Sequence, residues 1–136
     1  MKQLRSFMHM KSIIVFCVVA VSIPFIAKAD LFDQLVIAIK AGDSKQVSQY
    51  FNKTIDFATP TLSDVYSKAQ AEILLKDFFV SYPPKAFTIQ HRGSSAQGTK
   101  YIIGKYDYDK GSLRVYILIK EQNGQQLIQE LHFEKE

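Results

Sequence analysis

Two side chains that could take part in acid–base chemistry, Glu130 and His132, lie two residues apart near the end of the sequence. This spacing places both on one face of a β-strand. Together with a tyrosine such as Tyr106, they could supply a general base and a hydrogen-bond donor for a cofactor-independent isomerase, dehydratase or cyclase. The other interpretation is an exposed pair on the last strand, because Glu and His are common on solvated surfaces. We favour the exposed pair.

The remaining candidate groups do not form a metal or cofactor motif. After the N-terminal segment the histidines are His91 and His132, and they lack the HxH, HExxH and CxxC spacings that bring metal ligands together. His91 precedes a polar stretch, residues 92–95, that is typical of a strand end entering a loop. Residues 100–105 do not match the GxxxxGKS/T phosphate-binding pattern. We therefore expect no metal and no other cofactor.

Tyrosines and aliphatic residues alternate with core positions in two segments near residues 100 and 115, which puts Tyr101, Ile103, Tyr116 and Leu118 on the outward face of a sheet. Such a face could bind a ligand or a protein, because tyrosine has an apolar ring and a polar tip. Ordinary cross-strand packing is the alternative explanation. The partly apolar face favours self-association of the protein as a homodimer through its sheet.

The first 29 residues have the pattern of a cleaved signal peptide. Basic residues precede an apolar run over residues 13–27, and the small-residue site Ala27-Lys28-Ala29 follows. A membrane-spanning helix is the alternative, but this run of about 15 residues is shorter than the roughly 20 needed to cross a bilayer. We expect cleavage after Ala29 and a protein exported to the periplasm or the extracellular space. Translation could begin at Met1, Met8 or Met10.

Cleavage changes the charge and the cysteine content. Four bases leave with residues 1–29, which cancels the formal net charge of +4 of the full chain. The mature protein therefore has no basic excess that would favour nucleic acid. Cys17, the single cysteine, is also removed. We expect one cysteine-free α+β domain over residues 30–136, with no stable membrane span.

Three helices and one early strand are predicted in the first half of this domain. Apolar residues at three- and four-residue spacing predict a helix over residues 31–41, and Asp43 can cap a second helix whose Val47, Tyr50 and Phe51 share a face. Residues 54–58 are predicted as a strand and residues 59–64 as a turn or loop. Ser67 and Gln70 form a capping-box pattern for a third helix that ends near residue 81, before two prolines.

Four strands separated by glycine-containing turns follow, over residues 86–92, 100–108, 113–120 and 126–134, which favours an antiparallel meander. A two-residue loop at Lys110-Gly111 would pair Ile103 with Leu118 and Tyr101 with Lys120. That pairing assigns one face to the helices, formed by Ile102, Gly104, Tyr106, Tyr108, Leu113, Val115, Ile117 and Ile119.

The register of the last strand has two solutions. A two-residue hairpin at Asn123-Gly124 puts Ile128, Glu130 and His132 on the core face. A loop one residue longer or shorter puts Leu127, Leu131 and Phe133 there instead. We favour the second solution, because it buries more apolar volume.

The order of elements resembles the nuclear-transport-factor-2-like fold, a cone in which a curved sheet wraps around helices. Several stretches carry the resemblance: IKAGD at 39–43, YSKAQAE at 66–72, KDFF at 76–79, HRGSS at 91–95, RVYILIK at 114–120 and ELHFEK at 130–135. More narrowly, they are similar to a family of small exported bacterial proteins of unknown function. The resemblance implies a fold and a compartment, and it implies no established activity. Enzymes of the superfamily use a pocket carboxylate or histidine with a tyrosine, but no catalytic motif matches residue by residue here.

The sequence therefore predicts an exported, non-catalytic module that binds a ligand or a protein. Its partner could be a second copy, an envelope protein, or a small apolar ligand held between sheet and helices. The alternative is the cofactor-independent enzyme described above, which requires Glu130, His132 and Tyr106 to converge in a largely apolar pocket.

Overall fold

The computed structural model describes residues 24, 30–95 and 97–136. In this part of the chain the elements follow the order α1 (Leu31–Lys40), α2 (Ser44–Ser48), β1 (Phe51–Thr59), β2 (Leu62–Ser67), α3 (Lys68–Ser81), β3 (Ala86–Ser94), β4 (Thr99–Tyr108), β5 (Gly111–Gln122) and β6 (Gln125–Lys135). The predicted signal peptide lies outside the described residues, apart from Pro24.

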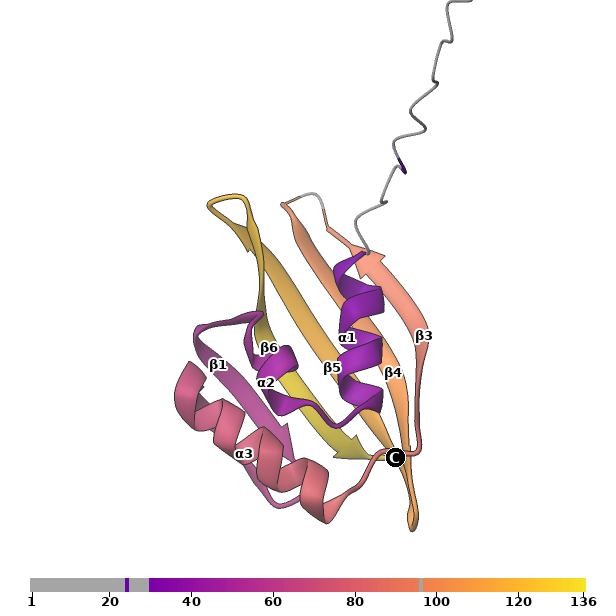
Figure 1. The fold of residues 1–136 in the computed structure, drawn as a ribbon. Helices are drawn as coiled ribbons and strands as arrows, with labels where there is room; N and C mark the ends of the chain where they lie inside the picture. Colours follow the sequence, from indigo (N-terminus) through magenta and orange to yellow (C-terminus); the bar gives the residue numbers. More distant parts are fainter. Residues whose placement is uncertain (1–23, 25–29, 96) are drawn as a thin grey trace, which may run out of the picture.

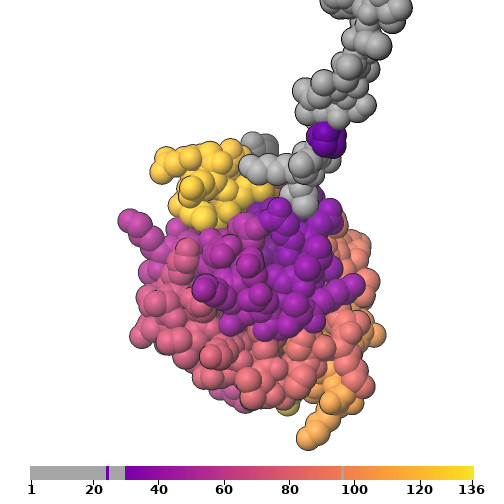
Figure 2. Space-filling model, viewed as in Figure 1, coloured from indigo at the N-terminus to yellow at the C-terminus, as the bar shows by residue number. Residues whose placement is uncertain are grey.

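The six strands form one curved, mixed sheet with the order β2-β1-β6-β5-β4-β3. β1 runs parallel to β6, and every other neighbouring pair is antiparallel. Figure 1 shows α1, α2 and α3 on the same side of the sheet. Figure 2, in the same view, shows that their side chains cover the middle of this side, while the β5–β6 hairpin stands beside α1 at one end.

Local sequence signals explain the helices. In α1 the buried residues Phe32, Leu35 and Ile39 recur at helical spacing and form the stripe that faces the sheet. Asp43 accepts a hydrogen bond from the backbone N–H of Gln46 and caps α2. The capping box predicted for α3 is confirmed, because the Ser67 and Gln70 side chains each accept from the other residue's backbone N–H.

The strand count and the sheet type differ from the prediction of one early strand followed by a four-strand antiparallel meander. Residues 62–67, of which 62–64 were expected in a turn or loop, form the edge strand β2, which pairs with β1 across a tight turn at Pro60-Thr61. β1 then lies beside β6, which makes the sheet mixed. β2 was missed because its apolar residues Leu62, Val65 and Tyr66 do not alternate with its polar ones, and four of its six residues are exposed. Phe51, expected on the second helix, begins β1.

The loop between β4 and β5 is also displaced from its predicted position. Tyr108 pairs with Gly111, so Asp109-Lys110 forms the connection rather than Lys110-Gly111. Ile103 therefore lies opposite Tyr116, and Tyr101 lies opposite Leu118. The loop moves by one residue, which moves the partner of each β4 residue by two positions along β5, so each side chain keeps the face that was predicted for it.

A β-bulge in β6 combines the two registers that the sequence left open. Asn123 and Gly124, with φ of 52° and 76°, form the two-residue turn of the first register, and Ile128 pairs with Ile119. Glu130 then pairs with Leu118, which leaves Gln129 as an extra residue. As a result Ile128, Leu131 and Phe133 are all buried in the core. The favoured register was correct for Leu131 and Phe133 and wrong for Leu127, which is half-buried.

Candidate functional site

The four residues predicted as an interface lie together on the sheet face opposite the helices. We call this surface the outer face and define it by Tyr101, Ile103, Tyr116 and Leu118. They form two adjacent cross-strand pairs on β4 and β5, Ile103 with Tyr116 and Tyr101 with Leu118. In the described part of the chain the helices pack against the other side of the sheet (Figure 1). The outer face therefore meets solvent in the single chain.

The ring of Tyr101 lies over Gly93 of the neighbouring strand, where the glycine leaves room for it. The two residues pair between β3 and β4. A Cβ atom placed on Gly93 would lie 2.1 Å from Cε1 of Tyr101, so the ring occupies the space where a side chain would otherwise be. The Tyr101 ring remains 38% exposed. This contact fixes an aromatic ring at the edge of the outer face.

β6 extends the outer face with Glu130 and His132. His132 lies opposite Tyr116, with ring centroids 6.0 Å apart, and Glu130 lies opposite Leu118. Nε2 of His132 is 3.1 Å from Oδ1 of Asp56, but the pair lacks hydrogen-bond geometry, and this buried nitrogen has no hydrogen-bond partner among the described residues. Nδ1 lies 3.8 Å from Oε1 of Glu134. Two carboxylates thus flank a histidine that is mostly shielded from water.

Tyr116 is the half-buried centre of this surface. Burial raises the pKa of its phenol, and the negative charge of Glu130 and the neighbouring Tyr101 raise that pKa further. The Tyr116 hydroxyl therefore stays protonated at neutral pH. It can donate a hydrogen bond at the middle of the surface.

Charge is distributed unevenly across the outer side of the sheet. Asp56, Glu130 and Glu134 lie on β1 and β6. On the same face His91 lies on β3, and Lys105 on β4 forms an ion pair with Asp107 at 3.7 Å. Arg114, on β5 between these groups, contacts Glu134 at 3.3 Å. The half of the outer side formed by β1 and β6 thus carries more acidic than basic residues, and the half formed by β3 and β4 does not.

The structure does not bring Tyr106 together with Glu130 and His132. Tyr106 is fully buried on the helix-facing side, where its hydroxyl donates a 2.5 Å hydrogen bond to the backbone carbonyl of Tyr82. Rings of Phe78, Phe79 and Phe133 surround it. Burial raises the pKa of the Tyr106 phenol well above its usual range. The sheet lies between this tyrosine and the two acid–base residues, so the arrangement expected for an enzyme is not formed.

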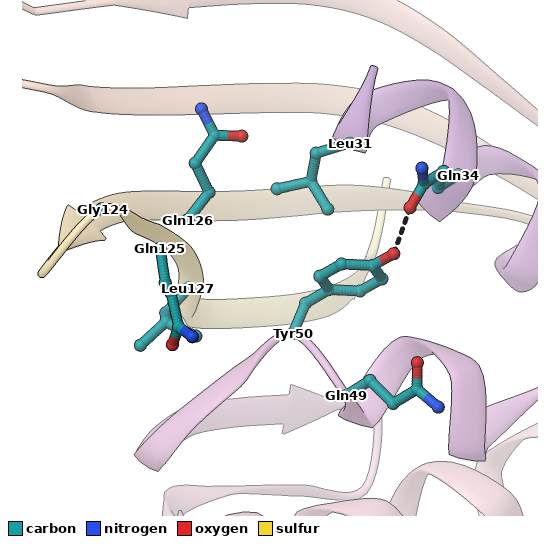
Figure 3. A pocket seen from close by; sticks show the side chains of 8 residues that line it. All are labelled: Leu31, Gln34, Gln49, Tyr50, Gly124, Gln125, Gln126 and Leu127. Atoms are coloured by element: carbon teal, nitrogen blue, oxygen red, sulfur yellow. Dashed lines mark hydrogen bonds between the residues drawn. The ribbon is translucent and has the colours of Figure 1, made fainter. Parts of the chain in front are cut away.

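A pocket that the sequence did not point to lies between α1 and the β5–β6 hairpin. We call it the hairpin pocket; its volume is about 460 Å³, and its walls come from the start of α1, the α2–β1 junction and the start of β6. Figure 3 shows Leu31 and Tyr50 pointing toward one another, with the Tyr50 hydroxyl hydrogen-bonded to Gln34 Oε1. The lining residues are Leu31, Gln34, Gln49, Tyr50, Gly124, Gln125, Gln126 and Leu127. The sequence signal was the four glutamines, but they lie in three separate segments that only the fold assembles.

Residues 30–95 and 97–136 contain no group of three or more His, Cys, Asp or Glu side chains that could hold a metal ion. Within the same ranges, no helix combines the length and the apolar character needed to cross a bilayer.

Solved structures of low identity share this fold. A DUF4783 family protein from Bacteroides ovatus is 23% identical, with a TM-score of 0.71 over 76% of this chain and 93% of that chain. A DUF4783 family protein from Bacteroides uniformis is 20% identical, with a TM-score of 0.73 over 79% and 98% of the two chains. A variant of the protein Rd1NTF2_05 has a TM-score of 0.62 at 12% identity over 74% and 90%. The nuclear-transport-factor-2-like architecture expected from the sequence is therefore confirmed.

The family comparison covers most of the domain. Among the curated proteins compared with it, none matches this chain. The family described as "Domain of unknown function (DUF4783)" matches residues 32–134, which include every helix and strand described above apart from the first residue of α1 and the last residue of β6. The chain belongs to the DUF4783 family of domains of unknown function.

Proposed function

We propose that this protein is an exported, non-catalytic binding module that associates with a second copy of itself through the outer face. The observation that supports this most is the contiguity of Tyr101, Ile103, Tyr116 and Leu118 on a sheet face with no described helix over it. Aromatic and aliphatic side chains at the centre of a patch are typical of protein interfaces.

The charge pattern favours a second copy as the partner. In a face-to-face dimer whose two-fold axis runs along β5, β6 of one copy lies over β4 of the other. Glu134 of one copy then lies at the level of Lys105 of the other, because Arg114 pairs with both residues, whereas Glu130 lies at the level of Tyr101. Such opposite charges at the rim guide the two faces into one register. Tyr116 and Leu118, which lie on β5, would each meet the same residue of the other copy.

The space between the sheet and α3 is filled by side chains, which does not favour the alternative that the protein binds a small apolar ligand there. The ring of Phe78 packs against that of Phe133 with centroids 4.1 Å apart and a tilt of 32°, and it lies 5.5 Å from the ring of Tyr106. These side chains fill the space between sheet and α3. A small apolar ligand would have to displace them, at the cost of the packing that stabilises the domain.

Export is part of the proposal and has its own test. Lys2, Arg5 and Lys11 before the apolar run, together with the Ala27-Lys28-Ala29 site, support cleavage after Ala29. Expression of the full chain in a bacterial host, followed by mass spectrometry of the exported fraction, should give a protein that begins at Asp30. A protein that keeps its first 29 residues and remains in the cytoplasm would contradict export.

Light scattering coupled to size-exclusion chromatography tests self-association of residues 30–136. We expect a dimer for the wild type, and monomers for Tyr116→Glu and Leu118→Glu, because each places a charge at the centre of the contact. Ile73→Glu, on the solvent-exposed side of α3, is the matched control and should remain dimeric. Circular dichroism establishes that each variant is folded. A wild type that stays monomeric at high concentration, or a folded Leu118→Glu that stays dimeric, contradicts the proposal.

A further inference from the structure

The hairpin pocket is lined by uncharged residues, half of which are glutamines. All eight residues that line it are uncharged, and four of them are glutamines, from α1, the end of α2 and the start of β6. Each glutamine amide offers both a donor and an acceptor. The volume of about 460 Å³ lies within the range of small-molecule sites, which is roughly 300–1,000 Å³. The pocket is therefore suited to a neutral ligand rich in groups that both donate and accept hydrogen bonds.

Apolar surface lies among these amides. The ring of Tyr50 and the side chain of Leu31 face each other across the pocket, while the amide of Gln126 lies on the hairpin side (Figure 3). A sugar ring has the matching character, because its C–H faces pack against aromatic and aliphatic groups while its hydroxyls lie around the edge. A charged ligand would meet no counter-charge among the eight lining residues.

The central lining residue is fixed before any ligand arrives. The Tyr50 hydroxyl donates to Gln34 Oε1, and the Tyr50 carbonyl accepts a 2.6 Å hydrogen bond from the backbone N–H of Ile128. These contacts tie the α2–β1 junction to α1 on one side and to β6 on the other. A ring that is held in place loses little conformational entropy on binding.

We infer that the hairpin pocket is a binding site for a neutral oligosaccharide. Tyr50 and Leu31 pack against the sugar, and Gln49 and Gln126 bind its hydroxyls, while Gln34 positions the Tyr50 ring. The pocket lies on the helix-bearing side of the sheet, so the inference is independent of association through the outer face.

Heteronuclear NMR titration of residues 30–136 tests the inference with maltotriose, cellotriose and mannotriose as neutral probes and trigalacturonate as a charged probe. We expect at least one neutral trisaccharide to shift the amide resonances of Leu31, Gln34, Tyr50 and Gln126. Trigalacturonate should leave them unchanged. Failure of all three neutral sugars, equal binding of the charged one, or shifts confined to other parts of the protein would overturn the inference.

Two substitutions and one matched control identify the residues responsible. Gln126→Ala should weaken binding about tenfold, the factor expected when one hydrogen-bonding group is lost. Tyr50→Phe keeps the ring but removes its hydrogen bond to Gln34, and should weaken binding to a smaller extent. Gln90→Ala, an exposed glutamine on the far edge strand β3, should bind like the wild type. Unchanged affinity in a folded Gln126→Ala protein would contradict the assignment of this side chain.

Discussion

The side chains of Asn52 and Gln129 join β1 to β6, the first and last strands in the sequence, which are neighbours in the sheet. Nδ2 of Asn52 donates a 3.0 Å hydrogen bond to Oε1 of Gln129. Gln129 is the extra residue of the β6 bulge, and β6 shifts register against both β1 and β5 at this point. The hydrogen bond therefore links the strands where the backbone ladders are interrupted.

A double-mutant cycle on this pair measures its contribution. Asn52→Ala and Gln129→Ala should each lower the free energy of unfolding, with a coupling energy of about 1 kcal/mol between them, because they remove the same hydrogen bond. Urea denaturation of the two single variants and the double variant gives this value. Strictly additive effects would show that the contact contributes nothing to stability.

Because of the bulge, Ile128 before Gln129 and Leu131 after it are both buried, although they are three residues apart on one strand. Ile128→Ala and Leu131→Ala should each lower the free energy of unfolding by about 2–5 kcal/mol, the cost of removing a buried aliphatic side chain. Glu130→Ala, on the outer side of the same strand, should change it by no more than about 1 kcal/mol. A strand without the bulge would bury only one of the two aliphatic residues, so a small effect at either position contradicts the observed register.

Tyr106 should make the free energy of unfolding depend on pH in the alkaline range. Its folded pKa lies above the ordinary value of 10.0, so the neutral phenol contributes stability that is complete below pH 10 and is lost as the pH rises further. Wild type should therefore be more stable than Tyr106→Phe at neutral pH, by about 1 kcal/mol for the hydrogen bond to Tyr82. This difference should shrink above pH 10. Chemical denaturation of both proteins across that range measures it, and a constant difference would show that Tyr106 ionises equally easily in both states.

Substitutions at two glycines test the outer face and the core independently, because Gly93 lies against Tyr101 and Gly104 lies against Phe87. A Cβ at Gly93 would meet only the far end of the Tyr101 ring, whereas one at Gly104 would lie 2.6 Å from the buried Phe87 ring and 3.1 Å from a backbone carbonyl. Gly104→Ala should therefore destabilise the domain by about 1–3 kcal/mol. Gly93→Ala should cost less than about 1 kcal/mol but should displace Tyr101 and weaken dimerisation about tenfold. Analytical ultracentrifugation and urea denaturation separate the two effects, and unchanged dimerisation of Gly93→Ala would exclude Tyr101 from the interface.

Sequence patterns predicted the elements whose signals are local. The capping box at Ser67 and Gln70 located α3, and the two-residue period placed Tyr101 and Tyr116 on the correct face even though the β4–β5 loop was displaced. β2 was missed because its pairing with β1, and not its own composition, makes it a strand. The bulge at Gln129 was missed because the apolar pattern of residues 126–134 fits two registers, and it does not show that the strand changes from one to the other.

The same distinction between local and long-range contacts decides which candidate site could be predicted. The outer face could be predicted because it lies on two consecutive strands, which a hairpin brings together without reference to the rest of the fold. The hairpin pocket could not, because Gln34, Tyr50 and Gln126 become neighbours only when α1 and β1 have docked on β6. The proposed Glu130, His132 and Tyr106 grouping depended on the register of β6, which the bulge decides.

The central claim is that two copies pack outer face to outer face along β5, and a single cysteine tests it directly. Residues 30–136 contain no cysteine, so Leu118→Cys introduces one thiol that would face its own counterpart across the two-fold axis. Mild oxidation should convert this variant to a covalent dimer, whereas Ile73→Cys, exposed on α3, should remain a monomer on a non-reducing gel. Equal cross-linking of the two variants, or none at Leu118→Cys, would contradict association through the outer face.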